Sequence, residues 1–255
     1  MQSRISNLKR LTGFCILIVA MLLPNICLAQ DEAASQAYIF SFLQVKPGMA
    51  LEFEEFMKSV LPALPEMGIT QLDVWRISNF GVSDKYVLIM PAPTPEAMDA
   101  ELAADETSIP VPIVPVLSAL NRLLVSSRDV MIIPQSELTI DTAEGYEGKL
   151  ALNLSIGTAP GRNAEFEAGL KQILDIMRET GVKGVYTSRV GYGGNLNEYN
   201  MSIFFDSFTD LAATMPKFEQ KMAEAQLAPP TGIVFYTESE VYVHVPELGI
   251  QPEAQ

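Results

Sequence analysis

The chain contains the same stretch of sequence twice. Shifted by 113 positions, which places Lys58 on Lys171, its two halves align without a gap over a long segment. The matched residues include turns, helix residues and single Gly, Arg and Tyr positions: Pro47-Gly48 on Pro160-Gly161, Glu52-Phe53-Glu54 on Glu165-Phe166-Glu167, Gly68 on Gly181, Arg76 on Arg189 and Tyr86 on Tyr199. The fold must therefore be one that can be assembled from two similar modules.

Each copy predicts four strands and two helices in the order β-α-β-β-α-β. Short apolar runs bounded by turn residues indicate strands, and apolar residues at helical spacing indicate helices. In the first copy we expect strands at 38–45, 69–77, 85–90 and 130–133. We expect one helix at 50–67, a second that begins after Thr94, and a further helical turn that ends at Leu124. Pro62 and Pro65 are expected to make the end of the first helix irregular. In the second copy we expect strands at 150–156, 182–190, 198–205 and 233–245, and helices at 163–180 and from Asp206 or Ser207 to about Gln226. This order predicts the α+β class, with two ferredoxin-like modules.

The first residues are typical of an export signal. A basic start with Arg4, Lys9 and Arg10 precedes an apolar run at 14–23, which is shorter than the roughly 20 residues that a membrane helix needs. We expect cleavage near Ala29-Gln30, a periplasmic or secreted protein, and no membrane attachment afterwards. The expected boundaries are a signal peptide at 1–29, modules at 37–135 and 149–246, a linker at 136–148 and a tail at 247–255.

The composition of the expected mature chain excludes several kinds of chemistry. Removing the three basic residues of the signal takes the formal charge from −14 to −17, which disfavours nucleic acid. Cys15 and Cys27 both leave with the signal, so no thiolate site is expected. His244 is the only histidine, which excludes multi-histidine metal centres. We therefore predict no metal and no cofactor.

Two such modules in one chain resemble the dimeric α/β barrel superfamily in tandem form, which includes the antibiotic-biosynthesis-monooxygenase-like, EthD-like and NIPSNAP-like families. The resemblance extends from about Tyr38 to Val245. It rests on the element order, the Pro-Gly turn before the Glu-Phe-Glu helix, and the duplication. It implies two four-stranded sheets that face each other around a cavity, with the helices outside. Both sheets would come from one polypeptide, so the expected state is a monomer, with a homodimer as the alternative.

The two copies differ on one face of their strands. Successive side chains of a strand point to opposite faces. The aliphatic face is common to both copies and is expected to pack on the helices, whereas the other face is aromatic or aliphatic in the first copy and small and polar in the second. We predict a pocket between the two sheets, because a mostly apolar cavity with a few polar groups is typical of a small-molecule site. The alternative is that the polar residues fill space around buried water. The expected pocket residues are Asn153, Ser155, Asn200, Ser202, Tyr38, Phe40, Phe42, Trp75 and Tyr186, with Asp73 and Ser188 as further candidates.

Other residue types favour structural roles. Arg76 and Arg189 are expected to pair with a helix carboxylate such as Glu52 or Glu165, with anion binding as the alternative. Tyr86 and Tyr199 are expected in the core, Trp75 is expected to serve packing, and His244 is expected at the surface. The glycine-rich segment at 191–194 links two strands, so it predicts a turn and not a phosphate loop.

Three functions compete at this level. The first is an exported protein that binds a small apolar or aromatic molecule. The second is an enzyme; the resemblance implies a cofactor-independent monooxygenase or an isomerase, with Asn153 and Trp75 as participants, or a haem-handling enzyme, which the scarcity of histidine opposes. The third is a filled barrel that acts as an interaction module through its acidic surface.

Overall fold

The computed structural model describes residues 36–78, 84–103, 113–143, 146, 148–227 and 232–250. The expected signal peptide lies outside these ranges. The chain divides into two compact units: unit 1 draws on Met1–Arg76, Val82–Val130 and Val245–Gln255, and unit 2 on Ile77–Gly81 and Met131–His244. Within the described ranges, no helix is long and apolar enough to cross a membrane.

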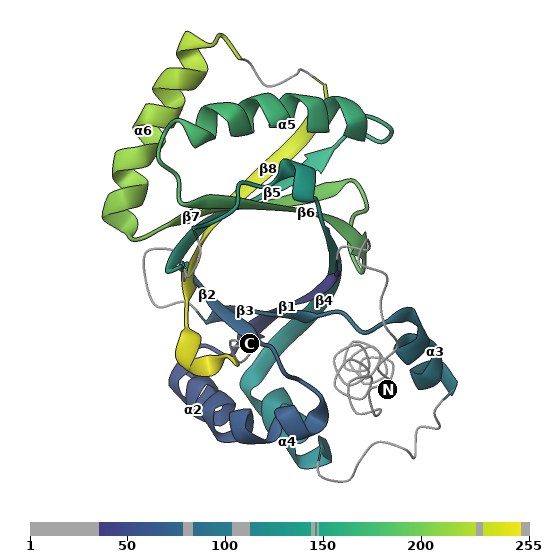
Figure 1. The fold of residues 1–255 in the computed structure, drawn as a ribbon. Coiled ribbons are helices and arrows are strands. Elements are labelled where there is room, and N and C mark those ends of the chain that lie inside the picture. The colour runs from purple at the N-terminus through teal and green to yellow at the C-terminus, as the bar shows by residue number, and fades with distance from the viewer. Residues whose placement is uncertain are drawn as a thin grey trace. The chain divides into compact units, whose positions relative to one another are not determined.

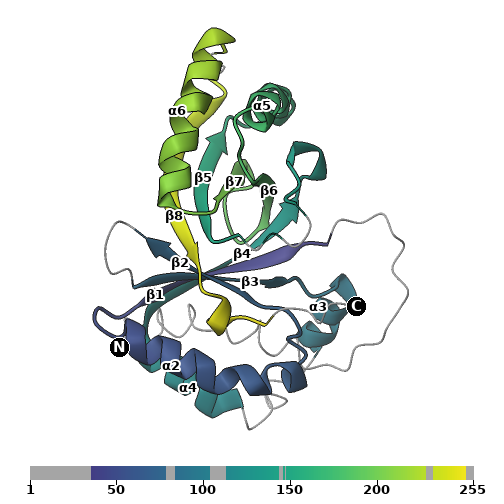
Figure 2. The same ribbon diagram turned by 60° about the vertical axis from the view of Figure 1, so that its left-hand side comes forward.

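Unit 1 contains an antiparallel sheet with helices on one face. Strand β1 (Tyr38–Val45) pairs with β3 (Lys85–Pro91), which pairs with β2 (Asp73–Ser78). The helices are α2 (Ala50–Val60), α3 (Pro95–Ala103) and α4 (Ile113–Leu123), and α2 and α4 lie side by side against the sheet (Figures 1 and 2). Thr94 precedes α3, and its hydroxyl accepts a hydrogen bond from the Ala97 N–H at 3.3 Å, which agrees with the expected cap.

Three boundaries in the first copy differ from expectation by more than one residue. The helix predicted to reach residue 67 ends at Val60 and continues as two 3-10 turns, Leu61–Ala63 and Pro65–Met67, because Pro62 and Pro65 cannot supply helical N–H donors. Strand β2 begins four residues later than predicted, at Asp73. Strand β4 (Leu124–Pro134) begins six residues earlier than predicted. The early half of β4 contains Ser126, Ser127 and Arg128, which hide the strand pattern.

Unit 2 repeats the arrangement. Strand β5 (Leu150–Thr158) pairs with both β7 (Glu198–Phe205) and β8 (Val234–His244), and β6 (Gly184–Tyr192) pairs with β7 and with the end of β4. Helices α5 (Asn163–Arg178) and α6 (Phe208–Glu224) cover one face of this sheet (Figure 1). Of the two candidate caps of α6, Ser207 takes the position, and its side chain accepts from the Asp210 N–H at 3.2 Å.

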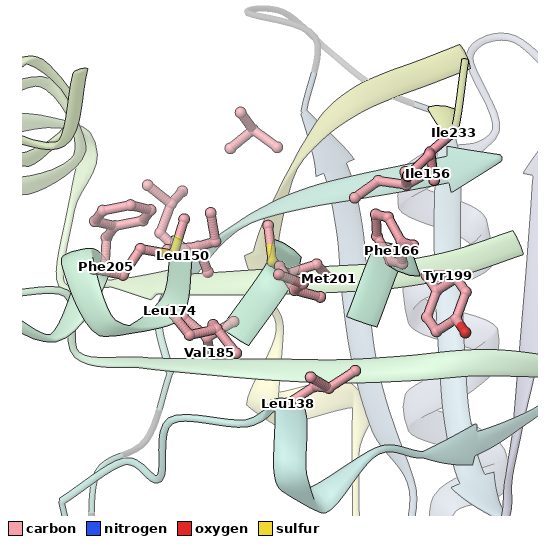
Figure 3. Close-up of a cluster of buried hydrophobic side chains, with 14 residues drawn as sticks. Leu138, Leu150, Ile156, Phe166, Leu174, Val185, Tyr199, Met201, Phe205 and Ile233 are labelled. Atoms are coloured by element: carbon pink, nitrogen blue, oxygen red, sulfur yellow. The ribbon is translucent and has the colours of Figure 1, made fainter. Parts of the chain in front are cut away.

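The hydrophobic core of unit 2 lies between the helices and the sheet. Figure 3 shows the side chains of α5 and of the strands meeting in one cluster. Phe166, Leu170, Leu174 and Met177 come from one face of α5, at helical spacing, and every one is buried. The strand residues of the cluster alternate with the residues of the opposite face, so the aliphatic face packs on the helices as expected; they include Leu150, Ile156, Val185, Tyr199, Met201, Ile203, Phe205 and Val241.

A buried tyrosine ties the first helix to the sheet in both units. The hydroxyl of Tyr86 donates to Glu54 Oε1 at 2.8 Å, and that of Tyr199 donates to Glu167 Oε1 at 2.6 Å. Each ring packs on the phenylalanine that precedes the glutamate, with centroids 4.6 Å apart in unit 1 and 4.7 Å apart in unit 2. We call this arrangement the tyrosine anchor.

Arginine completes the tyrosine anchor. Arg76 Nη1 lies 3.7 Å from Glu54 Oε1, and Arg189 lies beside Tyr199 in the second copy. The expected pairing of Arg76 with a helix carboxylate is thus confirmed, but the partner is Glu54 and not Glu52. Glu165 instead pairs with Arg162 on its own helix. Glu54 and Glu167, two positions after Glu52 and Glu165, are the glutamates that face the sheet. Helices α2 and α5 bury Phe53 and Phe166 in the core, and this orientation places the following glutamate over the tyrosine.

Each unit also contains a short segment that follows the last strand of the other sequence copy. In unit 1, Val245 N–H donates to Val74 O at 2.9 Å, and Leu72 and Ile250 exchange two backbone hydrogen bonds of 2.9 and 2.8 Å. In unit 2, Gln135 N–H donates to Thr187 O at 2.9 Å, and Ile140 and Val185 exchange two bonds of 2.8 Å. A 3-10 turn lies between the two contacts in each segment: Pro246–Leu248 and Ser136–Leu138.

The tyrosine anchor predicts a matched loss of stability in the two units. Tyr86→Phe and Tyr199→Phe should each lower the free energy of unfolding by about 1 kcal/mol, because a part-buried carboxylate loses its hydrogen-bond donor. Urea denaturation followed by circular dichroism measures the change. Tyr192→Phe is the control, since Tyr192 is 70% exposed. An equal loss in the control would contradict a specific role for the anchor.

The same tyrosines predict a loss of stability at alkaline pH. Burial first, and then the neighbouring glutamate, raise the pKa of Tyr86 and of Tyr199 well above the usual range. Their contribution to stability is complete below the unfolded pKa of about 10 and is lost as pH rises above it, because only the unfolded chain releases these protons. The double Tyr→Phe variant should therefore lose less stability than the wild type between about pH 9 and 11 in urea denaturation.

Candidate functional site

The sheet of unit 2 has a polar face opposite its helix-covered face. Because directly paired residues of antiparallel strands point to the same side, the registers give two rows across β8, β5, β7 and β6. The first row is Glu240, Asn153, Ser202 and Tyr186, and the second is Glu238, Ser155, Asn200 and Ser188. We call these eight residues the polar face.

Side-chain hydrogen bonds connect the centre of the polar face. Ser202 Oγ donates to Asn153 Oδ1 at 2.9 Å, and Ser155 Oγ donates to Asn200 Oδ1 at 3.1 Å. Asn153 Nδ2 in turn lies 3.4 Å from the hydroxyl of Tyr242, which follows Glu240 on the same face of β8. The structure therefore brings together the four polar residues that the sequence places on this face, Asn153, Ser155, Asn200 and Ser202.

These bonds leave donors available. Both serines use their hydroxyl protons on asparagine oxygens, which turns the two amide nitrogens outward from the pairs. One of the two N–H groups of Asn153 Nδ2 donates to the Tyr242 hydroxyl, and no described residue accepts from Asn200 Nδ2. Ser188 is fully buried, and its Oγ has no hydrogen-bond partner among the described residues. The polar face thus contains N–H and O–H donors that the described residues do not use.

Tyr242 and Glu240 form the acidic side of the first row. Tyr242 is 4% exposed, and burial first, then the adjacent Glu240 carboxylate, raise the pKa of its phenol well above the usual range. Tyr242 therefore stays protonated at neutral pH, accepts from Asn153 and orients its own proton toward Glu240. A carboxylate and an amide donor consequently lie side by side, at the paired positions Glu240 and Asn153.

Five of the six matching positions of unit 1 are apolar, and the sixth is Asp73. Phe40, Ile89 and Asp73 replace Asn153, Ser202 and Tyr186 in the first row, and Phe42, Val87 and Trp75 replace Ser155, Asn200 and Ser188 in the second. Phe40, Val87 and Trp75 are buried, and the rings of Phe40 and Phe42 lie 6.4 Å apart. The aromatic residues predicted for a pocket, Tyr38, Phe40, Phe42 and Trp75, thus belong to the sheet of unit 1, whereas Tyr186 lies on the polar face of unit 2.

Sequence reasoning missed the contribution of β8. Glu238, Glu240 and Tyr242 alternate with Ser239, Val241 and Val243, so their common face could have been found from the period of two. The signal was weak because Thr237 and Ser239 break the apolar half of the alternation. Pairing with β5 is what places the two carboxylates opposite Ser155 and Asn153.

Tyr236 borders the polar face. Its ring lies directly against the backbone of Gly157, where an added Cβ would be 2.1 Å from Tyr236 Cε1. Its hydroxyl donates to Glu198 of β7, the residue that pairs with Gly157 of β5. Glycine is needed here for the close approach of the ring, and Glu198 becomes a third carboxylate at this end of the sheet.

The remaining candidates have structural surroundings. His244 is half-buried and not fully at the surface, and Tyr86 and Tyr199 are fully buried as expected. Gly191 and Tyr192 end β6, so the turn that connects β6 to β7 is residues 193–197 and only partly coincides with the predicted segment at 191–194. Among the described residues, no group of three or more His, Cys, Asp or Glu side chains could hold a metal ion.

Known structures share this fold. An anthrone oxidase-like protein is 12% identical, with a TM-score of 0.58, and the match covers 84% of this chain and 92% of that one. A candidate monooxygenase from Fusobacterium nucleatum is 11% identical with a TM-score of 0.56 over 83% and 93%, and a chlorite dismutase from Candidatus Nitrospira defluvii is 11% identical with 0.51 over 84% and 93%. No family model and no curated protein sequence matches the chain. The chain therefore has the ferredoxin-like dimeric α/β barrel fold, as its repeat predicts.

The contact between Tyr236 and Gly157 predicts a compensated pair of substitutions. Gly157→Ala should displace the Tyr236 ring and cost about 1 kcal/mol of unfolding free energy, because the bond to Glu198 is lost. The same Gly157→Ala change in a Tyr236→Ala background should cost much less, since no ring remains to be displaced. Urea denaturation of the four proteins of this cycle gives the coupling. Equal costs in both backgrounds would show that the ring does not occupy this place.

Proposed function

We propose that the polar face of unit 2 binds a small organic molecule and that the protein oxidises this molecule with dioxygen. The observation that carries the proposal is the divergence of the two units: at six matched positions unit 1 has Phe40, Ile89, Asp73, Phe42, Val87 and Trp75, whereas unit 2 has Asn153, Ser202, Tyr186, Ser155, Asn200 and Ser188. A fold that is stable with a largely apolar face in one copy does not require four amides and hydroxyls at the centre of the same face in the other. Structural likeness to an anthrone oxidase-like protein and to a candidate monooxygenase supports an oxidative reaction.

The residues suit a substrate with an acidic C–H bond whose deprotonation gives an enolate conjugated with a carbonyl. Glu240 is the carboxylate that would accept this proton, and the N–H groups of Asn153 and Asn200 would donate to the enolate oxygen. The electron-rich enolate would then react with dioxygen itself. The balanced reaction converts a CH₂ group to a carbonyl, consumes one O₂ and releases one H₂O.

The hydrogen bonds from the serines define the geometry of this site. Ser202 holds the amide oxygen of Asn153, and Ser155 holds that of Asn200, so neither amide can reverse its donor and acceptor ends without losing a bond of 2.9 or 3.1 Å. Donors that are oriented before the substrate arrives need no reorganisation when charge develops on the oxygen. Ser155 and Ser202 are positioning residues in this proposal.

A second candidate is a binding protein without turnover, which would use the same donors to hold an oxygen-bearing ligand. The two candidates share the binding step and differ in the consumption of oxygen. An oxygen electrode separates them, because a binding protein retains its ligand unchanged.

The proposal predicts a large effect of one substitution. With anthrone-type tricyclic ketones as the substrate panel, the wild type should consume one O₂ for each molecule oxidised. Asn153→Leu should lower kcat by about 100-fold to 1,000-fold through the loss of an oxyanion donor. Asn121→Leu on the exposed side of α4 is the matched control and should retain full activity.

Binding is measured on the same variants by calorimetry with the product ketone. Loss of binding and turnover in Asn153→Leu, with an unchanged circular dichroism spectrum, supports the proposal. Unchanged kcat and affinity in a correctly folded Asn153→Leu protein would refute it. Binding without oxygen uptake in the wild type would leave the binding protein as the function.

A further inference from the structure

We propose that Ser188 and Asn200 form a second donor pair on the polar face, which binds a second acceptor oxygen of the ligand. This oxygen lies across one six-membered ring from the oxygen that receives the enolate charge. The inference rests on the proposed function and specifies the ligand as a ring with oxygens at opposite positions. Ser188 of β6 and Asn200 of β7 are directly paired, so their side chains are neighbours on the same side of the sheet.

The hydroxyl of Ser188 carries a proton for which the neighbouring side chains provide no acceptor. Ser188 is 0% exposed, and its Oγ has no hydrogen-bond partner among the described residues. On one side Ser188 pairs with Pro134 of β4, whose side chain has no polar atom. On the other side the amide oxygen of Asn200 already accepts from Ser155 at 3.1 Å. A buried donor of this kind is unfavourable unless an acceptor satisfies it, and a ligand oxygen is such an acceptor.

The amide of Asn200 directs its nitrogen toward the same place. Its Oδ1 accepts from Ser155, which stands on the β5 side, so Nδ2 lies at the other end of the amide, on the side where β6 continues the sheet. No described residue accepts from this nitrogen, and Asn200 is 6% exposed. One N–H of Asn200 and the O–H of Ser188 can therefore converge on a single acceptor atom.

The two N–H groups of Asn200 set the distance between the ligand oxygens. In the proposed function one of them donates to the enolate oxygen. Two acceptors that each lie about 2.9 Å from the same amide nitrogen, along its two N–H bonds, are about 5 Å apart. Oxygens at opposite positions of a six-membered ring have this separation, whereas oxygens on adjacent carbons lie much closer together. The CH₂ group that becomes a carbonyl would then be the ring position nearest Ser188, so the product gains the second oxygen there.

Unit 1 supports a role for this pair outside folding. Trp75 and Val87 occupy the matched positions, are directly paired in the same way and are buried. An apolar pair therefore serves the sheet at this place in one copy. A buried hydroxyl and amide in the other copy break the rule that buried polar groups are paired, and such departures are expected at functional sites.

Three tricyclic ketones of nearly equal size test the second oxygen. Opposite its first carbonyl, 9,10-anthraquinone has a second carbonyl oxygen, xanthone has an ether oxygen and acridone has an N–H group. None of them contains the CH₂ group that is oxidised, so equilibrium dialysis against the full chain measures binding alone. Affinity for anthraquinone should exceed that for acridone about 10-fold or more, with xanthone between them, because the acridone N–H would face two donors. Equal affinity for anthraquinone and acridone would overturn the inference and leave the proposed function standing.

Ser188→Ala separates a ligand contact from a structural role. The variant should reduce the preference for anthraquinone over acridone by about fivefold or more, and it should raise the midpoint of urea denaturation because no unpaired hydroxyl is buried. Ser239→Ala is the control, since Ser239 is exposed and faces the other side of β8, and it should leave the preference intact. A lower midpoint with an unchanged preference in Ser188→Ala would identify a structural hydroxyl and overturn the inference. Failure of the wild type to bind all three ketones would overturn the inference together with the proposed function.

Discussion

The hydrogen bond between a buried tyrosine and a helix glutamate determines which face of each sheet the first helix covers. Tyr86 with Glu54, and Tyr199 with Glu167, occupy equivalent places and keep nearly the same distances in spite of the divergence around them. The helix cannot slide along the sheet without moving this glutamate away and leaving a buried phenol unsatisfied. The helix therefore stays on one face, and the apolar residues of both copies are required there. The opposite face of each sheet is released from this requirement.

The two units differ in the residues on the face of the sheet that the helices do not cover. Unit 1 carries aromatic and branched side chains, including Phe40 and Val87, which bury apolar area and need no partners. Unit 2 carries amides and hydroxyls, which are costly to bury unless they are paired, and it pairs most of them within the sheet. The pairing leaves amide N–H groups at the centre of the polar face, next to the β8 residues Glu238 and Glu240. Amide donors held in this way suit a molecule that carries an acceptor oxygen.

Much of the fold could be predicted because its signals are local. The strands 38–45 and 198–205 have the bounds expected from their apolar runs, and Ser207 caps α6 through a contact three residues away. The end of α2 and the start of β4 were misjudged, since prolines turn one helix into 3-10 turns and Ser126, Ser127 and Arg128 obscure a strand. The site was only partly accessible, because Glu238 and Glu240 reach it through the register of β8 on β5. The contact of Tyr236 with Gly157 depends on that register too, and no local pattern contains it.

The segment that ends the described chain has a consequence for how the protein assembles. Leu72, just before the start of β2, finds its backbone partner at Ile250, near the other end of the sequence, whereas nearly all of unit 2 lies in one continuous stretch from Met131 to His244. A ribosome completes that stretch before it reaches the residues that finish unit 1. Unit 1 therefore stays incomplete, with Leu72 lacking its backbone partner, until residues 245–250 have been made, although most of its chain is synthesised first.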